Sequence, residues 1–387
     1  MLEFLIQIKD MGIEMKKYEL GQLLEYEQPT PYIVESTDYN DKYKTPVLTA
    51  GKSFVLGYTD EDFGIYNSLP VIIFDDFTTA TQFVNFPFKV KSSAMKILTA
   101  NTELALPKFI FYRMQIIEFD HSTHKRYWIQ QYSKTKVEIP SIPEQERIVA
   151  RIEELFSQLD SGVETLKKIK RQLAAYRRAV LYRAFESISE STAMGNLAQM
   201  IDPQPSHRTP PEVTGGVPYI GVGDINYDKK YINYSAARKV APTILDEHIE
   251  RYTLHEGDFI MGKIGTIGKP FKVQLPQNYT LSANVILIQP DCEKVVPDYL
   301  FWQFSSPLVT KQLTAGAAAT SQPAFGIKKA RLLSIRICGF EKQKEIVQKI
   351  EGRLSVCDSI EQTVDTALQQ AEAMRQSILR QAFMEGS

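Results

Sequence analysis

The sequence has few of the features that mark secreted, metal-binding or membrane proteins. Its 387 residues include three cysteines, Cys292, Cys338 and Cys357, which are widely spaced and form no CxxC pair. This spacing argues against a disulfide framework or a zinc site and fits a reducing cytoplasm. The apolar N-terminus is short, lacks a basic region and is interrupted by charges, so we expect no signal peptide. Since no apolar run approaches bilayer-spanning length, we expect no membrane partner.

Motifs for catalysis are also missing. There is no Asn/Asp-Pro-Pro-aromatic loop to hold a flipped base and no GxxxxGK[ST] phosphate loop. The five histidines form no HExxH or other metal spacing. The glycine-containing stretch at 219–224 is a weak match to a cofactor loop, and we interpret it as a strand followed by a turn. The sequence therefore predicts no catalytic residue, no bound metal and no cofactor in this chain.

Neither sign of charge is in excess. Lys and Arg number 45 against 46 Asp and Glu, giving a net charge of −1, with 43% hydrophobic and 24% charged residues. These proportions are those of a soluble globular protein. Any contact with nucleic acid would have to come from local basic patches, because the chain as a whole is not basic.

The sequence does contain an internal repeat. Residues 145–185, shifted by 198 positions, align without a gap with residues 343–383. Identical pairs include Gln145 with Gln343, Asp160 with Asp358, and Arg177 with Arg375; Ile152, Leu181 and Phe185 also recur. Two unrelated amphipathic helices would share a few such identities, but this many in one register indicates duplication.

Both copies are predicted to be long helices suited to coiled-coil packing. In the first copy, apolar residues from Ile148 to Val180 recur at spacings of three and four. Pro143 and the acidic residues that follow it favour a helix start there. About 40 residues at 1.5 Å per residue give a rod of roughly 60 Å.

Two aromatic-rich segments with short strand-like runs precede the helices and share a coarse layout. Pro46-Val47-Leu48 matches Pro218-Tyr219-Ile220, and the segment at 107–112 matches that at 297–302. We therefore predict an N-terminal domain at 1–140, a helix at 141–190, a second domain at 191–340 and a helix at 341–387. Chain connectivity favours antiparallel helices, since a parallel pair would force the second domain to bridge the whole rod. The predicted fold is α+β, with two pseudosymmetric domains at opposite ends of an antiparallel two-helix coiled coil.

This layout resembles the specificity subunits of type I restriction–modification systems. The stretch 257–269, which contains Gly265-Thr266-Ile267-Gly268, is similar to the strand and GTIG loop of the family's target-recognition domains. The segment 139–148 resembles the family's proline-bearing junction into a helix that begins with Glu-Gln. The second junction departs from this pattern, because it lacks the prolines and has Lys342 between Glu341 and Gln343.

The resemblance implies a non-catalytic subunit that recognises a bipartite site in double-stranded DNA. It also implies two copies of a methyltransferase (modification) subunit and a motor-nuclease (restriction) subunit as partners. S-adenosylmethionine, ATP and Mg²⁺ would then be bound by those partner subunits. Two alternatives remain open at this point, a self-contained DNA modification enzyme and a coiled-coil structural adaptor.

Candidate DNA contacts are polar and basic residues on the predicted loops, where they can reach phosphates or base edges. Asp75 and Asp76 form an acidic pair that we interpret as bonding within a loop or accepting from a cytosine amine. The predicted DNA-binding residues of the first domain are Thr78, Thr79, Thr81, Lys89, Lys91, Ser92, Ser93, His124, Lys125 and Arg126. Those of the second are Lys263, Thr266, Lys269, Lys272, Ser282, Asn284, Ser321, Gln322, Lys328, Lys329 and Arg331.

Overall fold

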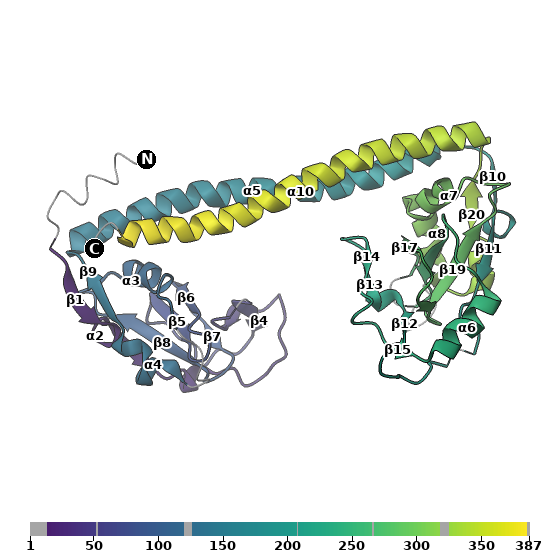
Figure 1. The fold of residues 1–387 in the computed structure, drawn as a ribbon. Helices are drawn as coiled ribbons and strands as arrows, with labels where there is room; N and C mark the ends of the chain where they lie inside the picture. Colours follow the sequence, from purple (N-terminus) through teal and green to yellow (C-terminus); the bar gives the residue numbers. More distant parts are fainter. Residues whose placement is uncertain are drawn as a thin grey trace. The chain divides into compact units, whose positions relative to one another are not determined.

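The computed structural model describes residues 14–51, 53–119, 126–206, 208–264, 267–317 and 325–384. The chain divides into two compact units, residues 1–167 with 365–387, and residues 168–364 (Figure 1). Two 45-residue helices, α5 (Ile142–Glu186) and α10 (Phe340–Met384), contribute one segment each to both units. The remaining elements form one α+β domain in each unit. No helix of the described residues combines the length and apolar character that crossing a membrane requires.

The two domains contain the following elements in chain order. The first comprises β1 (Lys16–Glu19), α2 (Leu20–Leu23), β2 (Leu24–Glu27), η1 (Thr30–Tyr32), β3 (Thr45–Leu48), β4 (Val55–Thr59), β5 (Val71–Asp75), β6 (Thr81–Val84), β7 (Lys89–Val90), β8 (Met95–Ala100), α3 (Pro107–Met114), α4 (Tyr127–Gln130), η2 (Tyr132–Lys134) and β9 (Lys136–Ile139). The second comprises β10 (Ser191–Ala193), η3 (Met194–Asn196), β11 (Ala198–Ile201), β12 (Val217–Ile220), η4 (Val222–Asp224), β13 (Ile225–Asn226), β14 (Tyr231–Ile232), β15 (Lys239–Val240), α6 (Pro242–Arg251), β16 (Phe259–Gly262), β17 (Pro270–Lys272), β18 (Thr280–Leu281), β19 (Val285–Pro290), α7 (Pro297–Phe304), α8 (Pro307–Ala317), α9 (Ile327–Ala330) and β20 (Ser334–Arg336).

The sheets of the two domains have the same topology. A four-stranded sheet has the order β2-β8-β5-β6 in the first domain and β11-β19-β16-β17 in the second. A three-stranded sheet, β4-β3-β7 or β15-β12-β18, combines one antiparallel and one parallel pairing in each case. A further pair, β1-β9 or β10-β20, joins the start of each domain to the strand that leads into its long helix. The duplication predicted from the helices therefore extends through both domains.

The inner strands of the four-stranded sheets, such as β5 and β16, are continuous apolar runs, because each sheet is covered on both faces. In β5, Ile72 and Phe74 face the core shared with α3 and the long helices, whereas Val71 and Ile73 face the three-stranded sheet. In β16, Phe259 and Met261 face the helices, while Ile260 faces the other side. This alternation is the period of two expected for a strand.

A buried glutamine near the start of each long helix anchors it to its domain. Gln145 accepts a hydrogen bond from Leu106 N (2.8 Å) and donates to Leu104 O (2.9 Å). Gln343, its partner in the repeat, accepts from Val296 N (2.8 Å) and donates to Cys338 O (2.7 Å). Leu106 and Val296 are the N-caps of α3 and α7, so each glutamine satisfies a helix-end amide that would otherwise lack a partner.

The long helices are antiparallel within each unit. In the unit formed by 168–364, the end of α5 packs on the start of α10, and Phe185 shares a core with Ile350. In the other unit, the start of α5 packs on the end of α10, and Ile152 shares a core with Phe383. The predicted α+β class and antiparallel helix pairing are thus confirmed.

Candidate nucleic-acid interface

In both domains, the loop after an inner strand is held by the same two backbone hydrogen bonds. The N–H of Asp76, after β5, donates to the residue before β8, and its C=O accepts from the first residue of α4. The N–H of Lys263, after β16, donates to Asn284 O (2.7 Å), and its C=O accepts from Phe325 N (2.9 Å). Asp76 and Lys263 are therefore equivalent positions. Around each of them three loops meet at one end of the four-stranded sheet, which makes this end a candidate binding surface.

Several predicted residues of the second domain lie on or beside this loop cluster. Lys263 is largely buried and pairs with Asp202 at 3.0 Å, whereas Asn284 is exposed. Lys269 is exposed, with its ammonium 4.5 Å from the centre of the Tyr227 ring. Other exposed side chains are those of Lys328, Lys329 and Arg331 in and after α9. Lys272 is exposed as well, but it lies opposite Phe259 at the other end of the sheet, where it pairs with Asp298. Thr266, Ser321 and Gln322 lie outside the described residues.

The prediction for Ser282 needs a correction. Its side chain is 5% exposed, and its Oγ accepts from Asn284 N at 3.3 Å. Its backbone N–H donates to Ile220 O, which ties the loop before β19 to the end of β12. Ser282 therefore shapes the loop that presents Asn284, rather than facing solvent itself.

In the first domain, the candidates that are exposed or half-buried gather in two loops and at one helix end. Thr78 and Thr79 lie in the turn between β5 and β6, where Thr79 has a left-handed backbone (φ 57°). Lys91, Ser92 and Ser93 are exposed between β7 and β8. Arg126 is exposed as the N-cap of α4. His124 and Lys125 lie outside the described residues.

Two candidates of the first domain are corrected because their side chains are used inside the protein. Lys89 is fully buried, pairs with Glu61 at 2.5 Å and donates to Phe63 O at 2.9 Å. Thr81 is 8% exposed and accepts a hydrogen bond from Gln115. A buried, ion-paired lysine is costly to expose, so neither side chain is available to a surface ligand in this structure.

The acidic pair belongs to the framework of the first domain. Asp75 Oδ1 accepts from Phe77 N (2.9 Å) and Thr78 N (2.8 Å), which shapes the turn. Asp76 is 1% exposed and accepts from Trp128 N at 2.8 Å, the second residue of α4. The interpretation as bonding within the loop is confirmed for Asp75, whereas Asp76 bonds to α4 and β8. The alternative of acceptance from a cytosine amine is wrong for Asp76, because its side chain is buried.

The sequence-based prediction missed Asp202 and the groups that support it. Asp202 follows β11, pairs with Lys263 and accepts from Gln204 N at 3.2 Å. Gln204 in turn contacts the buried His248 of α6 at 2.6 Å. Burial lowers the pKa of His248 to about 4, so the imidazole is neutral near pH 7. In the sequence, residues 18–23 resemble residues 193–197. This resemblance aligns the two strands that follow, β2 and β11, and could have located Asp202.

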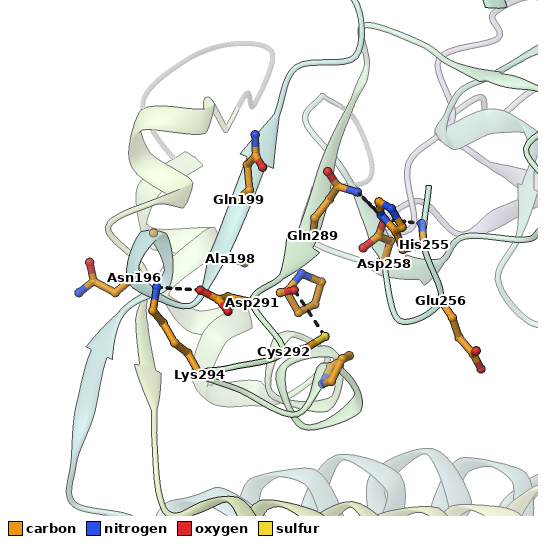
Figure 2. Close-up of a pocket in the computed structure, with 13 residues that line it drawn as sticks. Asn196, Ala198, Gln199, His255, Glu256, Asp258, Gln289, Asp291, Cys292 and Lys294 are labelled. Atoms are coloured by element: carbon orange, nitrogen blue, oxygen red, sulfur yellow. Dashed lines mark hydrogen bonds and ion pairs between the residues drawn. The ribbon is translucent and has the colours of Figure 1, made fainter. Parts of the chain in front are cut away.

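A polar cavity of about 660 Å³ lies at the other end of the same sheet (Figure 2). Asp258 precedes β16 and Gln289 lies near the end of β19, whereas Lys263 and Asn284 lie at the opposite strand ends. Gln289 Nε2 donates to Asp258 Oδ2 at 2.6 Å, and burial raises the pKa of Asp258. The cavity is therefore separate from the loop cluster. Among the described residues, no group of three or more His, Cys, Asp or Glu side chains is placed to hold a metal ion.

These features define a class of protein: two copies of one α+β domain, each with a loop cluster at a sheet end and a buried glutamine on its long helix. The chain belongs to the family described as "Type I restriction modification DNA specificity domain", which matches residues 12–174 and 204–370. The two matched segments agree with the duplication seen in the structure.

Individual relatives carry the same description. The chain is 43% identical over 176 residues to the type I restriction enzyme EcoR124I/EcoR124II specificity subunit of Escherichia coli, covering 44% of each chain. It is 25% identical over 276 residues to the EcoBI specificity subunit of Escherichia coli, covering 64% of this chain and 58% of that protein. The aligned regions thus span about half the length of these relatives.

A solved structure shares the fold. That chain comes from a study of complex assembly and conformational transition of the type I R-M system. It superposes with a TM-score of 0.67 at 15% identity, and the match covers 95% of this chain and 97% of that one.

Proposed function

We propose that this chain is the DNA-reading subunit of a type I restriction–modification complex and that each domain reads one half of a bipartite site. The observation that carries the proposal is the duplication of an entire domain, including the loop cluster around Asp76 and Lys263. A duplicated reader suits a duplex, whose two half-sites present equivalent surfaces to equivalent domains. The exposed lysines of the second cluster supply phosphate-binding charge in a chain that is otherwise balanced.

In this proposal the chain contributes recognition and its partners contribute chemistry. Two modification subunits would supply S-adenosylmethionine and methyl transfer, and a restriction subunit would supply ATP- and Mg²⁺-dependent cleavage. Such a complex would work in the cytoplasm, where the DNA lies. The similarity to named specificity subunits supports this division.

Two competing functions are less well supported. A self-contained modification enzyme would need a base-holding motif, which the sequence lacks. A purely structural adaptor would have no use for a second loop cluster with exposed Lys269, Lys328 and Lys329.

One experiment separates the three functions. The modified adenines of a host lacking other methylation are mapped after expression of the modification subunits with and without this chain. A specificity subunit gives one bipartite motif that depends on this chain. Methyl transfer by the purified chain alone would support the enzyme, and modification indifferent to the chain would support the adaptor.

A further inference from the structure

The corner where β11 and β16 end and β19 begins presents a paired cation and anion. Lys263 Nζ lies 3.0 Å from Asp202 Oδ2, with 16% of the lysine and 19% of the aspartate side chain exposed. Hydrogen bonds hold both residues in place. The backbone of Lys263 bonds to Asn284 and Phe325, and Asp202 Oδ1 accepts from Gln204 N. A donor and an acceptor are therefore held side by side at the surface of the loop cluster, with their geometry set in advance.

The equivalent corner of the first domain is closed. Asp76 occupies the position of Lys263, and its carboxylate accepts from the N-terminal turn of α4 through Trp128 N. It pairs at 3.5 Å with Lys96, which also donates to Gln28 Oε1 at 3.0 Å. Gln28 follows β2 as Asp202 follows β11. The side chains of Asp76 and Lys96 are 2% and 1% exposed, so this pair belongs to the interior.

The inversion of charge at one backbone position explains the difference. An aspartate at position 76 can accept from the amide N–H at the start of α4, and that hydrogen bond draws it inward. A lysine at 263 has only donors and cannot do the same for α9, so its ammonium is directed to Asp202 instead. The two domains thus use one framework for different purposes. The first buries its pair completely, and the second leaves a part of its pair exposed.

A partly exposed ion pair of this spacing matches the major-groove edge of a G·C base pair. Guanine O6 and cytosine N4 are hydrogen-bonded to each other, so they lie about 2.9 Å apart. An ammonium 3.0 Å from a carboxylate oxygen can face them, donating to guanine O6 and N7 and accepting from cytosine N4. The ion pair need not break on binding, since a carboxylate offers about four acceptor directions and an ammonium three donors.

We propose that Asp202 and Lys263 together read one G·C pair in the half-site of the second domain, which rests on the proposed function. Lys263 contacts the guanine and Asp202 the cytosine. C·G and A·T pairs reverse the order of acceptor and donor and are rejected. A T·A pair keeps the order of G·C but places the thymine methyl group where the ammonium expects guanine N7.

The test uses the assembled complex and the methylation map of the host genome. Lys263→Met and Asp202→Ala should each relax discrimination at the same single position by about 5- to 150-fold, leaving the other half-site unchanged. Lys263→Arg should retain the preference for guanine, because its guanidinium also donates to O6 and N7. The reciprocal exchange Asp202→Lys with Lys263→Asp should abolish the preference for G·C at that position without creating one for C·G, because an aspartate at 263 can bond to the start of α9 as Asp76 bonds to the start of α4.

The matched control is the exchange Asp291→Lys with Lys294→Asp. This pair is also an Asp–Lys contact, at 2.7 Å, but it lines the cavity at the other end of the sheet (Figure 2). This exchange should leave the base preference at every position of the recognition site as in the wild type. Retained recognition of the first half-site reports that each variant folds and assembles.

Two results would overturn the inference while leaving the proposed function intact. One is a wild-type half-site with no G·C position that responds to either substitution. The other is a uniform loss of modification at all sequences, which would assign Lys263 to a phosphate. If the wild-type complex modifies no bipartite site, the proposed function itself fails, and the two failures are thereby distinguished.

Discussion

Arg177 of α5 donates to Asp358 of α10 across 2.6 Å, and their repeat partners make the same contact with the helices exchanged. Arg375 lies 198 positions after Arg177, and Asp160 lies 198 positions before Asp358; these two are 2.9 Å apart. Residue i contacts residue j and the copy of j contacts the copy of i, which is the signature of a twofold interface. The duplicated helix therefore pairs with its own copy, in an antiparallel register that these contacts help to define.

The first prediction concerns the strength of these contacts. In a double-mutant cycle of Asp160→Ala and Arg375→Ala, we expect a coupling free energy of about 0.2–1 kcal/mol, falling as salt is added, because both groups are partly exposed. The single Arg375→Ala variant should lose more stability than the single Asp160→Ala variant, since the Arg375 guanidinium also lies 4.1 Å from the centre of the Phe156 ring. Chemical unfolding of the four proteins measures both effects. Zero coupling at low salt would show that the pair does not hold the register.

The second prediction concerns the buried glutamines. Gln145→Ala should lower the free energy of unfolding by about 1–3 kcal/mol, because Leu106 N loses its buried acceptor. Gln343→Ala should lower the free energy of unfolding by a similar amount, because Val296 N loses its acceptor. The matched control is Gln172→Ala on the exposed face of α5, which should stay within about 0.5 kcal/mol of the wild type. Equal effects at buried and exposed positions would contradict the anchoring role.

The architecture was predictable because repeats and periodicity survive in a single sequence. The repeat register of 198 residues and the apolar spacing predicted both long helices, α5 and α10. The matching segments at 107–112 and 297–302 are the equivalent helices α3 and α7. The side-chain roles were less accessible. Lys89 looks like a surface lysine in the sequence, and only the fold brings Glu61 against it. Asp202 carried no motif, and its pairing with Lys263 depends on two strands 61 residues apart in the chain.

The third prediction concerns His248 and pH. Its pKa in the folded protein is lowered to about 4, mainly by burial, from an ordinary value of 6.5. Between these values the unfolded chain binds the proton and the folded chain does not. Stability should therefore fall as the pH drops from about 6.5 to about 4.

The His248→Gln variant isolates this effect. The free energy of unfolding is measured against pH for both proteins, and the difference between the curves cancels the other titrating groups. We expect the difference to change across pH 4–6.5 and to be flat above pH 7. A difference curve that is flat throughout would mean that His248 is not held neutral by its surroundings.

The fourth prediction concerns phosphate contacts. Lys269→Ala combined with Lys328→Ala should weaken binding of the assembled complex to every duplex, with a salt slope shallower by about two. Base preferences should stay unchanged, since phosphate contacts carry no sequence information. Affinity is measured on specific and unrelated duplexes between 50 and 200 mM salt, roughly the range over which such contacts weaken. Lys294→Ala is the control, with the wild-type slope expected. If the double variant keeps the wild-type salt slope, neither Lys269 nor Lys328 contacts the DNA.

An exchange of domains tests whether the two domains read separate half-sites. Residues 191–339 are replaced by the corresponding domain of another member of the family, and the modified adenines are mapped for both complexes. We expect two short half-sites separated by unread base pairs. One half-site should change to that of the donor protein, while the other stays as it was. A continuous recognition sequence, or a change in both halves, would contradict it.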